Sequence, residues 1–319
     1  MADSADRTRF GPALALGDEL VHIGRALHDR GMTEHAVQAC FGVNCVGHVP
    51  RCTTSTPAPA TLTRAAVLPW LLVAGKTLPA EAVRAVLGDE LHQTMCRAAL
   101  LAERDAHVRA LVCMLPVGEA LAVCNRIGGD DVPLPDDSSF HMIGALPARR
   151  VDRWLDIGTG TAIAPLARRG LGGHVVGADV NTAVLACARL GAELSGATEL
   201  ELRTSDLFAA VEPDTWPLIT FNAPLPQPGS ELLARFWHDV RARVDDHSEV
   251  LVHSQQPRDS YIESLQLPGD VLVARYTPEA MDPAFGVTRW RPGGRHRSHL
   301  RHVSLTPAHP HVTRADLEW

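Results

Sequence analysis

The stretch WLDIGTGTAIAPLARRG, Trp154–Gly170, decides the fold of this 319-residue chain. The residues Arg153–Ile157 predict a buried strand, and two glycines follow it, before an apolar segment that predicts a helix through Arg168. Glycines directly after a strand let a ligand approach the backbone closely. Asp156 stands two positions before the first glycine, Gly158, where a negative charge suits an amino-acid moiety better than a pyrophosphate.

From residue 151 onwards, predicted strands and helices alternate along the chain. Strands are expected over Arg153–Ile157, His174–Ala178, Leu200–Thr204, Leu218–Phe221 and Val250–His253, with helices over Thr182–Leu194 and Glu231–Val244. This alternation predicts an α/β fold with a Rossmann-like, doubly wound and mostly parallel sheet. Ligands of such sheets bind beyond the carboxyl ends of the strands, so the residues at those ends are the candidate site.

Carboxylates and an amide follow the next three strands. Asp179 ends the second strand, 23 residues after Asp156, and can accept hydrogen bonds from the two hydroxyls of a ribose. Asp206 follows the third strand, where a carboxylate could bind an adenine amino group, and Asn222 ends the fourth. The G-x-G-x-x-G pattern of nicotinamide enzymes fails, because Ile163 stands where its third glycine would be.

With these residues in this order, the chain resembles the class I methyltransferases that use S-adenosylmethionine (SAM). The four matching segments span about residues 151–228: WLDIGTGTAIAPLARRG, GADVNTAVLACARLGAELSG, LRTSDLF and FNAPL, the last a variant of an Asn-Pro-Pro-Tyr/Phe motif. The resemblance implies SAM as the cofactor and a set of roles at the strand ends. Asp156, Gly158, Thr159 and Gly160 would line its methionine part, Asp179 its ribose, and Val180, Asn181, Asp206 and Leu207 its adenine.

The fourth motif departs from the family pattern. The resemblance implies that Asn222 contacts both SAM and the acceptor, and that Ala223, Pro224 and Leu225 face the acceptor. Leu225 replaces the aromatic ring that would stack on a base, and losing such a ring removes roughly 1–3 kcal/mol of base affinity. A smaller or aliphatic acceptor is therefore favoured over a flipped nucleobase.

Methyl transfer requires alignment of the acceptor and, for some acceptors, removal of a proton. His253, at the end of the fifth strand, is the candidate base, and Asn222 is the candidate group that orients the acceptor.

The first part of the chain differs in character. Residues 1–146 predict a mainly helical domain with a small β appendage, and a polar linker over 128–139 precedes the SAM domain at 147–319. ALHDRGMTEHAVQACFG and VRALVCMLPVGEALAVCNRI resemble the helical N-terminal domain of actinobacterial methyltransferases. This domain is expected to bind the substrate or to cover the cofactor, because little chain separates Phe140 from Trp154.

Composition excludes several function classes. Lys76 is the only lysine, so no Gly-Lys-Ser/Thr phosphate loop exists and imine chemistry is disfavoured. A formal charge of −7 argues against nonspecific nucleic-acid binding. Seven scattered cysteines and a charged N-terminus predict reduced thiols in a cytoplasmic protein. The spacing of Cys40, Cys45, His48 and Cys52 matches no zinc module, and no apolar run could span a membrane.

These features predict a SAM-dependent methyltransferase of specialised metabolism that modifies nitrogen or oxygen of a small molecule or peptide, as a possible homodimer. Three alternatives stay open: a nucleic-acid or ribosomal-protein methyltransferase, an enzyme that uses SAM in intramolecular chemistry, and a SAM-binding scaffold. The arginines between Arg289 and Arg301 are the expected readers of charge on the acceptor, if it carries any. Gly293 and Gly294 predict a hairpin in that segment.

Overall fold

The computed structural model describes residues 10–49, 53, 55–59, 61–124, 134–225, 231–256, 261–276 and 284–319. These residues form two compact units that do not follow the order of the chain. One unit comprises residues 1–136, 160–167 and 181–198, and the other comprises residues 137–159, 168–180 and 199–319. The predicted domain boundary at residue 147 stays a prediction, and the predicted linker and Cys52 lie wholly or partly outside the described residues.

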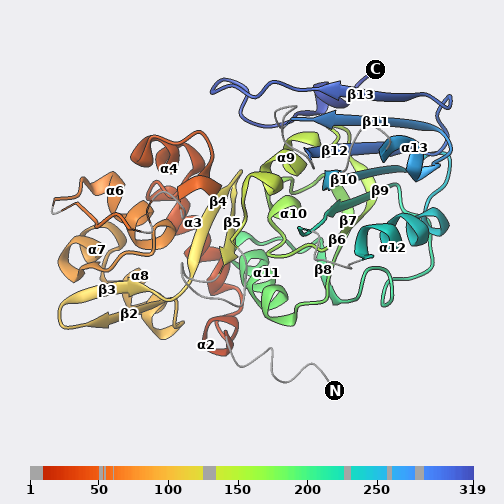
Figure 1. Ribbon diagram of the computed structural model, residues 1–319. Helices are drawn as coiled ribbons and strands as arrows, with labels where there is room; N and C mark the ends of the chain where they lie inside the picture. The colour runs from red at the N-terminus through yellow and green to blue at the C-terminus, as the bar shows by residue number, and fades with distance from the viewer. Residues whose placement is uncertain are drawn as a thin grey trace. The chain divides into compact units, whose positions relative to one another are not determined.

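An eight-stranded sheet organises the second unit (Figure 1). Its strand order is β13-β11-β12-β10-β9-β6-β7-β8, with neighbours parallel except for β12, which is antiparallel to both β10 and β11. The strands are β6 (Val151–Ile157), β7 (Gly172–Asp179), β8 (Leu200–Thr204), β9 (Leu218–Asn222), β10 (Glu249–Gln256), β11 (Asp270–Arg275), β12 (Ala284–Arg291) and β13 (Ser298–His302). This order confirms the predicted Rossmann-like, mostly parallel sheet.

Short helices complete this unit: α9 (Asp137–Ala145), α12 (Leu232–Asp239), η3 (Val240–Arg243), α13 (Tyr261–Leu265) and η4 (Arg314–Leu317). The core of the unit lies between the sheet and α12 with α13, where Phe236 and Trp237 of α12 pack on strand residues such as Phe221 and Trp290. Aliphatic strands buried on both faces are typical of parallel sheets. Because every strand of this sheet except β12 runs in the same direction, the carboxyl ends of the other seven strands face one edge of the unit.

The other unit is mainly helical and carries two small antiparallel sheets, as predicted (Figure 1). Its helices are α2 (Gly11–Leu14), α3 (Glu19–Asp29), α4 (Glu34–Phe41), η1 (Val46–His48), α6 (Arg64–Leu68), the π-helix η2 (Pro69–Val73), α7 (Ala80–Leu87), α8 (Asp89–Arg97), α10 (Ile163–Ala167) and α11 (Thr182–Ser195). Its strands are β1 (Leu78–Pro79), β2 (Leu101–Arg104), β3 (His107–Ala110), β4 (Cys113–Val117) and β5 (Ala120–Cys124).

Some predicted elements were wrong in detail. The predicted hairpin at Gly293–Gly294 does not form, because β13 pairs in parallel with β11 and not with β12. Helix α6 is followed directly by the π-helix η2 at Pro69, because proline has no backbone N–H to donate in a continuous α-helix. Strand β11 had no sequence prediction.

The six cysteines among the described residues are free thiols, as expected. In that same part of the chain, every helix is too short or too polar to cross a lipid bilayer.

Candidate active site

The glycine loop after β6 begins at the carboxyl edge of the sheet. Gly158 has a φ of +61°, and a Cβ at this position would lie 3.2 Å from the Phe221 ring of β9. Both the left-handed backbone and the close approach require glycine. Gly160 is also left-handed, with a φ of +57°. The loop therefore turns sharply, and Gly158 packs closely against the Phe221 ring.

Asp156 fastens this loop to the neighbouring strand. Thr159 in the loop donates a hydrogen bond from Oγ1 to Asp156 Oδ2 at 2.7 Å, and Thr220 of β9 donates from its hydroxyl to Asp156 Oδ1. The Trp154 indole N–H donates in turn to Thr220 Oγ1 at 2.8 Å. Asp156 thus has a structural role that the sequence did not reveal, while its predicted contact with the methionine part of SAM stays a prediction.

The pKa of the Asp156 carboxyl is raised above its usual value. Burial disfavours the charged form and raises the pKa of Asp156 to about 6, against the opposing effect of the hydrogen bonds from Thr220 and Thr159. The nearby charge of Asp179 raises it further. A group titrating near neutral pH at this edge of the sheet is typical of a functional site, but structural networks produce the same effect.

The end of β7 carries the residues expected to hold ribose and adenine. Asp179 is half-buried, and its backbone carbonyl accepts from the N–H of Ser205. Val180 follows with 70% of its surface exposed. Asn181 caps α11, because its side-chain oxygen accepts from the backbone N–H groups of Ala183 and Val184. Asn181 therefore has a structural role, and its predicted place beside adenine stays a prediction.

The Ser205 side chain forms two hydrogen bonds within the loop after β8. Ser205 donates from its hydroxyl to the Leu207 carbonyl at 2.8 Å and accepts from the Ala210 N–H. Leu207 is buried with a φ of +48°, a conformation that costs a residue with a Cβ about 1–3 kcal/mol and is concentrated at functional sites. Asp206 forms an ion pair at 2.7 Å with Arg235 of α12, and both side chains are about half exposed.

Asn222, the last residue of β9, has a buried side-chain amide oxygen. Asn222 donates from Nδ2 to Ser138 Oγ of α9 at 2.9 Å. Among the described residues, its Oδ1 is buried and has no hydrogen-bond partner. An unpaired buried acceptor costs about 1–3 kcal/mol. Leu225, three residues on, is 61% exposed, although the half-buried Ala223 packs against the core.

His253 lies beside Asn222, as the sequence predicts for two parallel strand ends. The two residues are register partners in β9 and β10, and the His253 carbonyl accepts from the Ala223 N–H at 2.9 Å. His253 is buried, and its Nε2 is 2.8 Å from the hydroxyl oxygen of Tyr276. His141 of α9 stacks on the Tyr276 ring, with 3.9 Å between ring centroids.

Sequence reasoning missed Tyr276, His141 and Ser138. Tyr276 follows an unpredicted strand. Ser138 lies within the segment 128–139 that was predicted as a linker, and His141 follows it; the linker prediction is wrong over 137–139, where α9 begins. No local pattern marks them, because only the pairing of β10 through β12 to β11 brings Tyr276 to the edge that carries His253.

The arginines expected to read charge on an acceptor are largely engaged within this unit. Arg289 pairs with Glu249 and donates to the Leu317 carbonyl, and Arg297 pairs with Asp270 at 2.6 Å. Arg301 donates to backbone carbonyls of the C-terminal segment. These contacts fasten the chain end to the sheet, which is a structural task.

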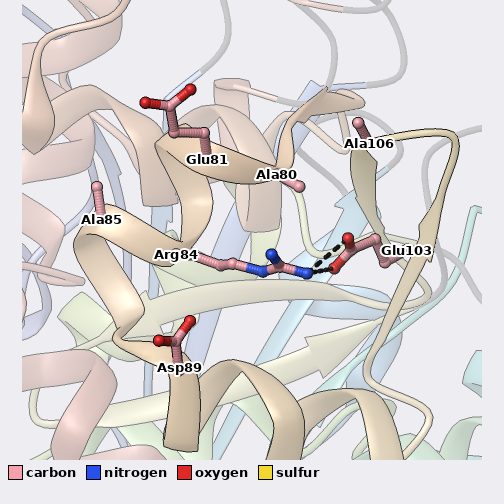
Figure 2. Close-up of a pocket in the computed structure, with 7 residues that line it drawn as sticks. All are labelled: Ala80, Glu81, Arg84, Ala85, Asp89, Glu103 and Ala106. Atoms are coloured by element: carbon pink, nitrogen blue, oxygen red, sulfur yellow. Dashed lines mark hydrogen bonds and ion pairs between the residues drawn. The ribbon is translucent and has the colours of Figure 1, made fainter.

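A shallow, open depression of about 520 Å³ lies in the helical unit, and none of the residues that line it belongs to the four motifs. Figure 2 shows Arg84 of α7 extending across it to Glu103 of β2, with 2.7 Å between their charged atoms. Glu81 and Asp89 line its rim. Because Arg84 is already paired, the depression holds no free cation that would bind an anionic ligand.

Comparison with known proteins finds similarity in solved structures only. No protein-family model matches the chain. No curated protein sequence matches it. A SAM-dependent methyltransferase from Agrobacterium tumefaciens superposes with a TM-score of 0.42 at 14% identity, over 57% of this chain and 71% of that one.

Two further solved structures are similar to part of the chain. A predicted O-methyltransferase, also from Agrobacterium tumefaciens, gives a TM-score of 0.41 at 17% identity, over 53% of this chain and 86% of that one. The ribosomal protein L11 methylase from Lactobacillus delbrueckii subsp. bulgaricus gives 0.38 at 19% identity, over 48% and 76%.

Proposed function

We propose that this chain, whose sheet is the Rossmann-like sheet expected of a class I methyltransferase, transfers the methyl group of SAM to nitrogen or oxygen of a small molecule or peptide. One observation carries the proposal: Asn222 Oδ1 is buried without a partner at the strand end next to the glycine loop. Such an atom is stabilised when an O–H or N–H group donates to it. A methyl acceptor supplies that donor.

The residues around the glycine loop fit SAM. Gly158 is exposed and Gly160 is half-buried, and neither has a side chain, so the turn suits close approach of the methionine part. Asp179 offers a half-buried carboxylate at the next strand end for the ribose hydroxyls. The exposed Val180 offers an apolar surface for the adenine ring. When bound, SAM supplies an activated methyl group on a sulfonium sulfur, so the protein has chiefly to align the acceptor and accept a proton.

A nucleic-acid acceptor is less well supported than a small one. A nucleic acid requires free cations for its phosphates and aromatic rings for its bases. Arg289, Arg297 and Arg301 are engaged in contacts within the unit, and the motif position that would stack on a base is Leu225. Both features favour the small-molecule or peptide acceptor.

Binding is tested first, with S-adenosylhomocysteine (SAH) as the calorimetric ligand. The Asp179→Ala variant should weaken SAH binding by about tenfold or more, because a hydrogen bond to a charged group contributes about 1.5–3 kcal/mol. The matched control is Asp214→Ala, which removes a half-exposed carboxylate paired with Arg153 in the same unit. Unchanged affinity in Asp179→Ala would refute the ribose assignment.

Acceptor class is tested second, by incubating methyl-labelled SAM and the protein with separate small-molecule, peptide and RNA fractions of a cell extract. Label should enter the small-molecule or peptide fraction and be lost in Asn222→Ala, while SAH affinity changes little. A marked preference for ribosomal RNA would contradict the proposed acceptor.

A further inference from the structure

A pair of ionisable side chains lies next to the proposed acceptor position. His253 Nε2 and the Tyr276 hydroxyl are 2.8 Å apart, a hydrogen-bonding distance. His253 is 2% exposed, whereas Tyr276 is half-buried and so retains a surface that a ligand could reach. Phe285, at the start of β12, flanks both rings, with centroids 6.1 Å from His253 and 6.4 Å from Tyr276.

Helix α9 brings this pair and Asn222 together. Ser138 and His141 are three residues apart, so they lie on the same face of the helix, about 5–6 Å from each other. Ser138 accepts from Asn222, and His141 stacks on Tyr276. Asn222 and Tyr276 therefore contact neighbouring positions of one helix face. The register pairing of Asn222 with His253 gives the same proximity independently.

A backbone hydrogen bond holds the His141 ring. The backbone N–H of Val312 donates to His141 Nδ1 at 2.9 Å. The ring lies on the Tyr276 face at 25° to it, and the His311 ring is nearly perpendicular to it. His141 thus supports the Tyr276 ring, whereas His253 is the imidazole within hydrogen-bonding distance of the Tyr276 hydroxyl.

We propose that Tyr276 and His253 form a proton-accepting pair for a hydroxyl acceptor, with His141 as the positioning residue beneath the Tyr276 ring; this rests on the proposed methyltransferase function. The acceptor hydroxyl donates to Tyr276 Oη, and a second O–H or N–H group of the same acceptor donates to Asn222 Oδ1. As the oxygen of the acceptor hydroxyl bonds to the methyl carbon and the carbon–sulfur bond breaks, the hydroxyl proton passes to Tyr276 Oη, and the Tyr276 proton passes to His253 Nε2. The positive charge that was on sulfur is then on His253, and after the product leaves, the proton returns through the half-buried Tyr276 hydroxyl to solvent.

A hydroxyl acceptor explains the pair better than an amine. A neutral amine already carries a free lone pair and loses its proton after the transfer, when it is acidic. A hydroxyl oxygen is a poor nucleophile until its proton is removed, and a positioned general base contributes about 10²–10⁴-fold in such a step. A tyrosine backed by histidine is suited to that removal and is superfluous for an amine.

The pair can be observed without any acceptor, because the chain has only two tyrosines. Labelling tyrosine with ¹³C at Cζ gives two resonances, assigned with Tyr276→Phe. Tyr261, buried in the core where it accepts from the Trp237 indole, is the internal control. The Tyr276 resonance should move as His253 is protonated, and that movement should disappear in His253→Gln and persist in His141→Phe. If the Tyr276 resonance moves with pH in His253→Gln as it does in the wild type, the proposed pairing is wrong.

Transfer is measured under single-turnover conditions with methyl-labelled SAM and two small probes, catechol as the hydroxyl and benzylamine as the amine. The wild-type protein should methylate catechol in preference. Tyr276→Phe and His253→Gln should each slow this transfer by about 100-fold, with SAH affinity unchanged. His141→Ala should slow it and His141→Phe should restore it, because the ring alone supports Tyr276.

The matched control is Tyr261→Phe, which should lower stability and leave the transfer rate unchanged. Undiminished catechol transfer in Tyr276→Phe would overturn the proposal. So would a wild-type protein that binds SAM and methylates only benzylamine, or neither probe. Absence of SAM and SAH binding would instead refute the proposed function, and the tyrosine resonances would still report on the pair.

Discussion

The stability of the sheet unit should depend on pH through Asp156. Burial raises the pKa of this carboxyl to about 6 in the folded protein, while an unfolded aspartate titrates near 3.9. Between these values the folded state binds one proton that the unfolded state has lost, so stability falls as pH rises. A rise of about two in pKa corresponds to about 3 kcal/mol, fully present below pH 4 and lost above about pH 6.

The variant Asp156→Asn isolates this contribution. Asparagine has no charge to bury, can accept from one threonine and can donate to the other. The free energy of unfolding of Asp156→Asn minus that of the wild type should increase by about 3 kcal/mol between pH 4 and pH 7. Urea unfolding followed by tryptophan fluorescence measures it, because Trp154 and Trp216 are buried in this unit. Other titrating groups occur in both proteins and cancel in the difference.

Asp270→Asn is the matched control of opposite sign. The hydrogen bond from Arg297 lowers the pKa of Asp270 to about 2, so this carboxyl is ionised in both states above pH 5. The free energy of unfolding of Asp270→Asn minus that of the wild type should be negative and constant from pH 5 to pH 7. A difference for Asp156→Asn that is equally constant from pH 4 to pH 7, or that decreases, would refute the burial argument.

Three further variants test the structure. Gly158→Ala should cost about 1–3 kcal/mol in urea unfolding, because its left-handed φ and the 3.2 Å approach to Phe221 exclude a Cβ without strain; an alanine variant as stable as the wild type would contradict this. Glu249→Gln leaves the buried Arg289 without its charge partner and should lower stability by about 3 kcal/mol or more in the same assay; no loss would mean that water already solvates the pair. Lys76→Arg should leave SAH affinity unchanged in calorimetry, and a large loss would show that the single lysine has a role in the site.

The sequence alone was sufficient for the order and type of the elements from β6 to β10. The strand Leu200–Thr204 and the helix from Thr182 were predicted almost to the residue, because alternating apolar patterns and glycine turns are local signals. The strand ends that carry Asp179, Asn222 and His253 followed from the same patterns, since parallel strands must end at one edge.

The sequence did not reveal the residues that surround the proposed acceptor position, Ser138, His141 and Tyr276. Helix α9 begins within the segment that was predicted as a linker, and its Ser138 and His141 acquire roles only when the helix packs on the sheet. The two compact units also do not follow the order of the chain, since α10 and α11 follow strands of the sheet in sequence but belong to the helical unit. The hydrogen bond from Asn222 to Ser138 joins residues more than 80 positions apart, and no local pattern encodes it.

What the sequence determined by itself was the five strands β6 to β10, the glycine loop, and the residues Asp156, Asp179, Asn222 and His253 at the strand ends. The apolar periodicity of a strand and the residues of a turn are properties of neighbouring residues, so the sequence shows them directly. What only the tertiary structure decided was the surroundings of those residues: Asp156 fastened by Thr220, Asn222 Oδ1 buried without a partner, and Tyr276 against His253. Burial and hydrogen-bond partners depend on strand pairing and helix packing, and these exist only in the folded chain.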